Sequence, residues 1–91
     1  MQKRQVDIVI DGRVQGVGFR YFAMEKAEEL HITGWIRNTW DGKVEIEALG
    51  EEQQLNTFID WMKMGPARAV IHTFTLSELS QERTYTNFTI R

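Results

Sequence analysis

The 91-residue sequence contains no cysteine and a single proline. Without cysteine the chain can form no disulfide bond, no thiolate metal site and no thiol nucleophile. A strong excess of one charge is also missing, because 11 Lys and Arg face 13 Asp and Glu for a formal net charge of −2. Binders of nucleic acid or of anionic membranes normally carry a basic patch. The alternating charges here form none, so we expect neither partner.

Long hydrophobic runs are missing as well. The first residues, "MQKRQVDIVIDG", combine basic side chains with only a short alternating apolar stretch, which is neither a signal peptide nor a membrane span. We therefore expect a cytoplasmic protein. With 42% hydrophobic residues and no repeat or linker, residues 1–91 are expected to form one small domain around one core.

Hydrophobic periodicity predicts the elements of this domain. Apolar residues recur at helical spacing over residues 19–30 and 51–64. The dipeptide Asp41-Gly42 predicts a hairpin with a two-residue turn. Strands with alternating or β-branched residues are expected at 5–11, 33–39 and 43–49, and within 67–79 and 85–91.

The expected order is therefore β-α-β-β-α-β with a short final strand. Each strand alternates apolar and polar residues, so both helices must cover the same face of the sheet. This predicts an α+β fold, the ferredoxin-like split β-α-β sandwich (βαββαβ), with two helices on one face of a mainly antiparallel sheet of four or five strands.

The topology brings two distant segments together. Strands 5–11 and 33–39 run parallel through a right-handed crossover, with strand 43–49 antiparallel between them. Their carboxyl ends then lie at one edge of the sheet, about two strand spacings or roughly 10 Å apart. Arg20 opens the first helix at this edge. Asn38 ends the second strand on the helix side, so the two side chains are expected to converge.

The stretch "DGRVQGVGFRYF" between the first strand and the first helix contains Gly12, Gly16 and Gly18. Glycines allow positive φ and let successive main-chain N–H groups turn inward as a nest for an anion. Arg20 is a cation at the positive end of a helix dipole, which costs about 0.3–1 kcal/mol. A phosphate bound by the nest, the dipole and the guanidinium reverses this cost, so we interpret the stretch as a phosphate-binding loop.

The loop does not match the known nucleotide-binding motifs. "GVGFRY" has Tyr21 where a dinucleotide-binding fingerprint needs its third glycine, and the chain contains no nucleotide P-loop. A structural alternative stays open, in which the glycines only shape a tight connection and Arg20 pairs with a surface carboxylate.

The remaining residues narrow the chemistry. His31 follows the first helix and His72 lies in a later strand, so both are interpreted as structural. Asp11 would repel a phosphate, and no group has metal-ligand spacing, so we expect no metal and no cofactor. Such a site suits an acyl phosphate, because its carboxylate leaving group has a pKa around 4 and needs no general acid.

Two motifs carry a resemblance to a known family. "GRVQGVGFR", residues 12–20, and "GWIRNTWDGKVEIEALG", residues 34–50, resemble the two signatures of the acylphosphatase family, and the similarity extends to the closing "FTIR". Departures are Ile36, where a smaller residue is common, and one proline in "GPARAV" where the family often has two. The resemblance implies the same fold, with Arg20 as the phosphate-binding catalytic arginine and Asn38 positioning water. It implies a phosphate cradle made by the amides of Gln15, Gly16, Val17, Gly18 and Phe19.

The function expected is metal-independent hydrolysis of the carboxyl-phosphate bond of a small acyl phosphate by direct attack of water. The protein is expected to act as a monomer. One alternative is an RNA-binding module, which the acidic residues Glu45 and Glu47 on the open sheet face disfavour. The other is a small-molecule sensor or protein-interaction module that keeps the anion nest without chemistry, although such a protein would have no use for Asn38.

Overall fold

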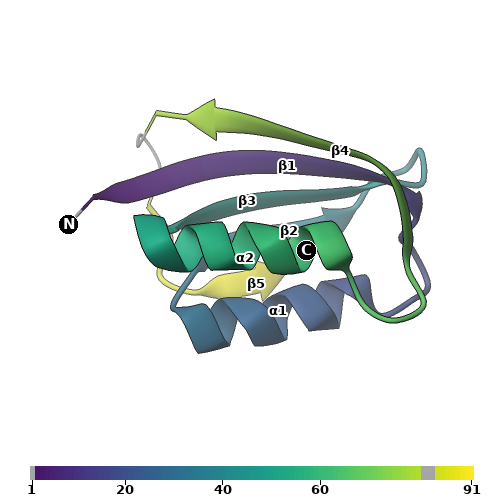
Figure 1. Cartoon of the computed structure of the whole chain (residues 1–91), viewed down its shortest axis with the longest axis horizontal. Helices are drawn as coiled ribbons and strands as arrows, with labels where there is room; N and C mark the ends of the chain where they lie inside the picture. Colours follow the sequence, from purple (N-terminus) through teal and green to yellow (C-terminus); the bar gives the residue numbers. More distant parts are fainter. Residues whose placement is uncertain (1, 81–83) are drawn as a thin grey trace.

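The computed structural model describes residues 2–80 and 84–91 of the chain. Two helices lie in front of a twisted sheet of five strands (Figure 1). The elements in chain order are β1 (Lys3–Arg13), α1 (Phe19–Leu30), β2 (Thr33–Asn38), β3 (Val44–Glu51), α2 (Glu52–Met64), β4 (Val70–Leu79) and β5 (Phe88–Ile90). The predicted α+β ferredoxin-like class and the predicted order of elements are confirmed.

The sheet has the strand order β4-β1-β3-β2-β5. β3 pairs antiparallel with both β1 and β2, so β1 and β2 run parallel on either side of it, as expected. β4 pairs antiparallel with β1 at one edge, with a register shift between Asp11 and Gly12. β5 pairs parallel with β2 at the other edge, a placement that strand periodicity alone did not predict.

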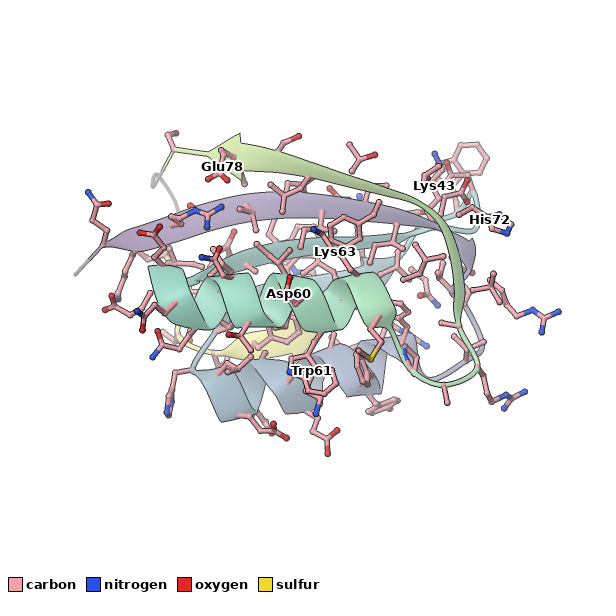
Figure 2. The ribbon with its side chains drawn as sticks, viewed as in Figure 1. Lys43, Asp60, Trp61, Lys63, His72 and Glu78 are labelled. Atoms are coloured by element: carbon pink, nitrogen blue, oxygen red, sulfur yellow. The ribbon has the colours of Figure 1, made fainter. Side chains whose placement is uncertain are left out.

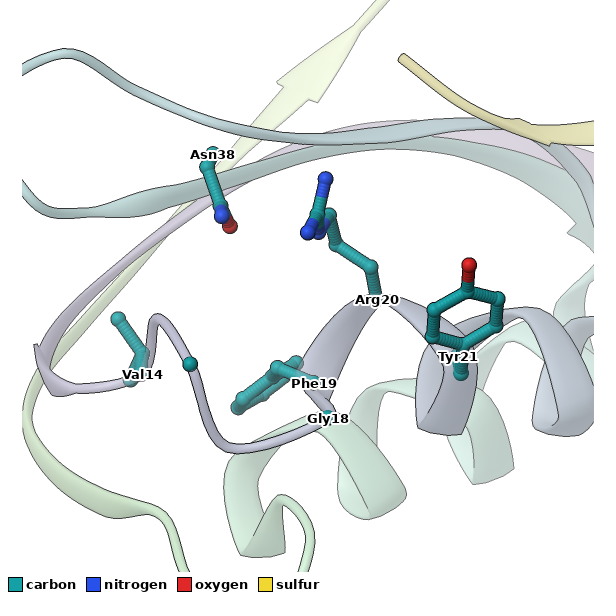
Figure 3. A pocket seen from close by; sticks show the side chains of 7 residues that line it. Val14, Gly18, Phe19, Arg20, Tyr21 and Asn38 are labelled. Atoms are coloured by element: carbon teal, nitrogen blue, oxygen red, sulfur yellow. The ribbon is translucent and has the colours of Figure 1, made fainter.

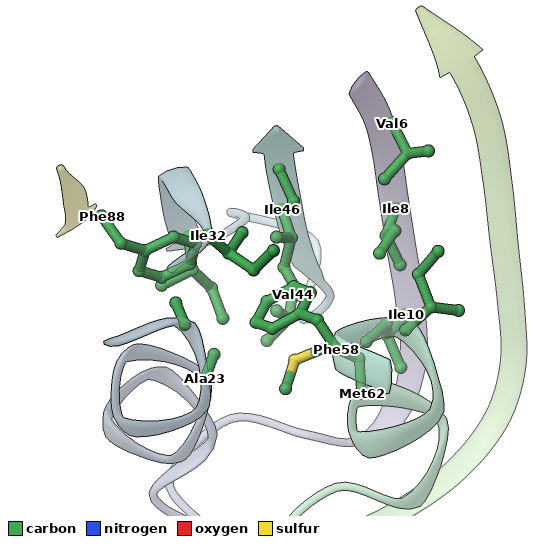
Figure 4. Packing of buried hydrophobic residues seen from close by; sticks show 14 of the residues in the cluster. Val6, Ile8, Ile10, Ala23, Ile32, Val44, Ile46, Phe58, Met62 and Phe88 are labelled. Atoms are coloured by element: carbon green, nitrogen blue, oxygen red, sulfur yellow. The ribbon is translucent and has the colours of Figure 1, made fainter. Parts of the chain in front are cut away.

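Both helices cover one face of the sheet and enclose the core with it (Figure 4). The buried helical residues lie on one stripe of each helix, as the spacing predicted. Phe58 of α2 and Phe88 of β5 meet edge to face in the core, with ring centroids 5.9 Å apart, while α1 is the helix that lies against β5. Side chains with no exposed surface include Val6, Ile8, Ile10, Ala23, Ile36, Val44, Ile46, Leu55, Phe58 and Met62.

The two helices also contact each other on their outer side, where Trp61 projects from α2 (Figure 2). Its ring meets that of Phe22 of α1 edge to face at 6.2 Å. The ammonium of Lys26 lies 4.0 Å from the centroid of the Trp61 ring, a cation–π contact. No helix among the described residues is long and apolar enough to cross a membrane.

The hairpin between β2 and β3 differs from the prediction. The N–H of Thr39 donates to the carbonyl of Lys43 at 2.8 Å, and the N–H of Gly42 donates to the carbonyl of Thr39 at 3.2 Å. Three residues, 40–42, therefore make the reversal instead of two. Gly42 adopts φ 90°, so it supplies the left-handed residue that closes a three-residue loop.

Candidate active site

The connection between β1 and α1 spans residues 14–18 and bends at two glycines. Gly16 has φ 73° and Gly18 has φ 82°, conformations that side chains with a Cβ rarely adopt. Gly18 is also the N-cap of α1 and has no side chain to occupy the free N–H groups of the first helical turn. These donors are therefore available to a ligand at the end of the helix.

A cavity of about 140 Å³ opens above this loop (Figure 3). The Arg20 guanidinium rises from the first turn of α1, and the Asn38 amide reaches down from the end of β2 toward the same space (Figure 3). The convergence expected from the topology is therefore present in the structure. The cavity is lined by Val14, Gly16, Gly18, Phe19, Arg20, Tyr21 and Asn38.

Arg20 has no acidic partner among the described residues. No ion pair or side-chain hydrogen bond of its guanidinium occurs in residues 2–80 and 84–91, and no carboxylate lines the cavity. The first turn of α1 contains no acidic residue either. The described residues therefore contain no pair between Arg20 and a surface carboxylate, which was the structural alternative for this loop. A half-buried cation beside free N–H groups forms a site for an anion.

The predicted cradle residues contribute in different ways. Gly16, Gly18 and Phe19 line the cavity, whereas Gln15 and Val17 do not. The Phe19 side chain is only 2% exposed and packs into the core, so only its main chain can face a ligand. Val17 likewise packs against the core.

Gln15 has a side-chain role that the sequence analysis missed. Its Nε2 donates to the carbonyl of Thr39 at 2.8 Å and to the carbonyl of Lys43 at 2.9 Å. It thereby ties the glycine loop to the hairpin that begins directly after Asn38. The N–H of Lys43 donates to Thr39 Oγ1 at 2.9 Å, which holds the hairpin in shape. The distance between loop and strand end is therefore set by direct hydrogen bonds.

Two further lining residues were missed. Val14 is 1% exposed and forms an apolar wall, which its place directly after a strand could have indicated. Tyr21 lines the cavity and is 71% exposed. An aromatic residue on the polar side of the predicted helix was the available signal for it.

The other candidate groups lie elsewhere. His31 is the C-cap of α1, where its main-chain N–H donates to the carbonyl of Ala27, and His72 is exposed on β4 (Figure 2). Asp11 Oδ1 accepts the Gly12 N–H at 3.0 Å. Within residues 2–80 and 84–91 no three His, Asp or Glu side chains are grouped as metal ligands would be. The site thus consists of main-chain donors, one guanidinium and one amide.

Comparison with known proteins identifies the family of this chain. The family model described as Acylphosphatase matches residues 6–90. The chain belongs to the acylphosphatase family. The two sequence motifs of that family, residues 12–20 and 34–50, are the segments that form the glycine loop with the first turn of α1 and the hairpin that carries Asn38. The predicted resemblance is confirmed.

Individual acylphosphatases match along nearly the whole chain. The acylphosphatase of Oceanobacillus iheyensis is 38% identical over 89 residues, which cover 97% of this chain and 98% of that protein. The acylphosphatase of Marinobacter nauticus is 43% identical over 81 residues, covering 89% of this chain and 88% of that protein. The crystal structure of acylphosphatase from Bacillus subtilis superposes with a TM-score of 0.93 at 38% identity, covering 97% of this chain and 98% of that one.

Proposed function

We propose that this protein hydrolyses small acyl phosphates to a carboxylate and inorganic phosphate, without a metal ion. The phosphoryl group is bound in the cavity above the glycine loop. Main-chain N–H groups of the loop from Gln15 through Phe19, of which Gly16, Gly18 and Phe19 line the cavity, and the guanidinium of Arg20 hold its equatorial oxygens. Membership of the acylphosphatase family supports the reaction, and the geometry of the cavity supports the roles of these residues.

The mechanism is a direct displacement. Asn38 orients a water molecule whose oxygen attacks phosphorus in line with the bond to the carboxyl oxygen. That bond breaks, its electron pair leaves with the carboxylate, and the water proton passes to a phosphate oxygen. Charge that develops on the equatorial oxygens is stabilised by Arg20 and the loop amides. The leaving carboxylate is stable at neutral pH, so no protein acid is required.

One observation carries the proposal: an arginine without an acidic partner and an asparagine amide face the same small cavity at the end of a helix. The decisive experiment is hydrolysis of benzoyl phosphate by the purified protein in the presence of EDTA. Release of inorganic phosphate at the same rate with and without EDTA supports the hydrolase and its independence from metal. Binding of phosphate without turnover would instead support an anion sensor.

The oligomeric state, the location and the partners of the protein are part of the proposal. We expect a monomer of residues 1–91 that works in the cytoplasm, uses no cofactor and does not bind nucleic acid. Size-exclusion chromatography with light scattering tests the monomer, because a dimer would elute at twice the mass of 10.7 kDa. Addition of RNA to the hydrolysis assay tests for competition at the site.

A further inference from the structure

Tyr21 is an exposed aromatic residue at the mouth of the candidate active site. Most large apolar side chains of this protein are buried, but Tyr21 keeps 71% of its surface exposed while lining the phosphate cavity. It follows Arg20 directly on the first turn of α1. Among the described side chains this ring packs neither in the core nor against it. Because it also lines the cavity, its surface is available to a ligand bound there.

The geometry of the displacement places the acyl group relative to this ring. In-line attack requires the water and the leaving group to lie on opposite sides of phosphorus. Asn38, which orients the water, lies on one side of the Arg20 guanidinium, and Tyr21 lies on the other (Figure 3). With the phosphoryl group held at the Arg20 guanidinium as proposed, a carboxylate that departs away from Asn38 departs on the side of the Tyr21 ring.

We propose that Tyr21 is the specificity residue for the acyl group and favours planar or apolar acyl chains, such as an aryl group, over an acetyl group. This inference rests on the proposed function. The exposed ring offers one face on which a second ring can stack, and the phenol keeps its hydroxyl in water. A methyl group is too small to use that surface, so the preference arises from the area of the acyl chain.

A second exposed aromatic residue provides a matched control. Trp40 is 98% exposed in the turn that begins two residues after Asn38, and it does not line the cavity. Both residues thus expose an aromatic ring, but only Tyr21 lines the cavity. The two substitutions separate a directed contact from a general effect of surface apolarity.

The test compares kcat/KM for benzoyl phosphate with kcat/KM for acetyl phosphate. In Tyr21→Ala the ratio of the two is expected to fall about three- to tenfold, the range of one aromatic stacking contact. Tyr21→Phe keeps the ring and is expected to keep the ratio, and so is Trp40→Ala. An unchanged ratio in Tyr21→Ala, an equal fall in Tyr21→Phe, or a fall in Trp40→Ala instead would overturn the inference.

A binding experiment separates this inference from the proposed function. Benzylphosphonate and methylphosphonate cannot be hydrolysed, and calorimetry gives the Kd of each for the wild type and for Tyr21→Ala. If the wild type hydrolyses neither acyl phosphate, the hydrolase proposal fails. A selective loss of benzylphosphonate binding in Tyr21→Ala would still support the acyl-group contact. Equal weakening of both ligands would refute it, whatever the turnover.

Discussion

At the scale of single residues, Arg20 illustrates how a binding site opposes stability. A cation in the first turn of a helix faces the positive end of the helix dipole, and no acidic residue of that turn compensates it. The unfavourable energy is about 0.3–1 kcal/mol, and a bound phosphate turns the same arrangement into an attraction. The proposed phosphate site therefore accounts for a cation at this position.

Substitution of the two polar side chains should separate binding from turnover. Arg20→Ala is expected to weaken phosphate binding and to lower kcat by about 10²–10³, because it removes a donor to both ground state and transition state. Asn38→Ala should lower kcat with little change in KM, because the amide acts on the water. Steady-state kinetics with benzoyl phosphate measure both. Full turnover in folded Asn38→Ala protein would contradict the role of Asn38.

The side chain of Gln15 supports the candidate site by binding two main-chain carbonyls of the hairpin. Gln15→Ala removes two hydrogen bonds, to the carbonyls of Thr39 and Lys43, although each carbonyl keeps one main-chain N–H donor. We expect a loss of about 1–3 kcal/mol in the free energy of unfolding and a drop in kcat as the hairpin moves relative to the loop. Urea unfolding and kinetics test this, with Gln53→Ala on the exposed side of α2 as the control. A stable Gln15→Ala protein would show that other contacts fix the hairpin.

At the scale of elements, close packing decides where the chain needs glycine. Gly34 lies in β2 with φ 141°, and a Cβ there would come within 1.9 Å of the carbonyl oxygen of Glu47 on β3. No side chain fits such a gap, so the pairing of β2 with β3 requires this glycine. The sequence showed a glycine in a strand, but only the neighbouring strand explains it.

The end of α1 carries an avoidable strain. His31 adopts φ 58°, the left-handed conformation that glycine favours at the C-cap. His31→Gly is therefore expected to raise the free energy of unfolding by about 0.5–1 kcal/mol at pH 8. His31→Ala keeps the strained backbone and serves as the control, with little change expected. Thermal unfolding of both variants measures the effect, and equal melting temperatures would argue against strain at this cap.

At the scale of the whole molecule, the face of the sheet opposite the helices holds a group of carboxyl groups. Asp7 of β1 lies close to Glu45 and Glu47 of β3, and Arg37 of β2 pairs with Glu45 at 2.7 Å. Burial, a hydrogen bond to Glu45 and the negative charges of Glu45 and Glu47 raise the pKa of Asp7 to about 7. Burial acts to raise the pKa of Glu45, but hydrogen bonds from Arg37 and Asp7 together lower it.

These opposite shifts predict a dependence of stability on pH. Unfolded Asp7 loses its proton near its ordinary pKa of 3.8 while folded Asp7 keeps it until about 7, so stability falls as the pH rises between these values. The full shift corresponds to about 4 kcal/mol, and solvent screening of the half-buried carboxyl reduces it to about 1–2 kcal/mol. Glu45 acts in the opposite sense and only below its ordinary pKa of 4.5, as its stabilising ionised form is lost.

Asp7→Asn isolates this effect. The variant should be more stable than the wild type at pH 7.5 by about 1–2 kcal/mol, and the difference should shrink toward pH 5. Urea unfolding at several pH values measures it, with Asp60→Asn on the exposed side of α2 as the control. A constant difference across this range would show that Asp7 is ionised throughout.

The local sequence was sufficient to predict the helices and strands, and it indicates an anion site at the loop. The bounds of α1 and the buried stripe of α2 follow from helical spacing, because one face of each helix must be apolar to pack on a sheet. The order of elements then left few topologies, since crossover connections are right-handed. The glycines and Arg20 indicated an anion site because their backbone freedom and charge are intrinsic properties of those residues.

Tertiary structure alone decided the remaining features, because each depends on contacts between residues far apart in the chain. The side chain of Gln15 reaches the hairpin 24 and 28 residues later. β5 joins β2 in parallel at the sheet edge, and Asp7 meets the carboxyl groups of β3 only through strand pairing. Likewise, Arg20 lacks an acidic partner among the described residues because the folded surface around it places no carboxylate within reach. Periodicity reports which face of an element is buried, but it does not report which group from another element will face it.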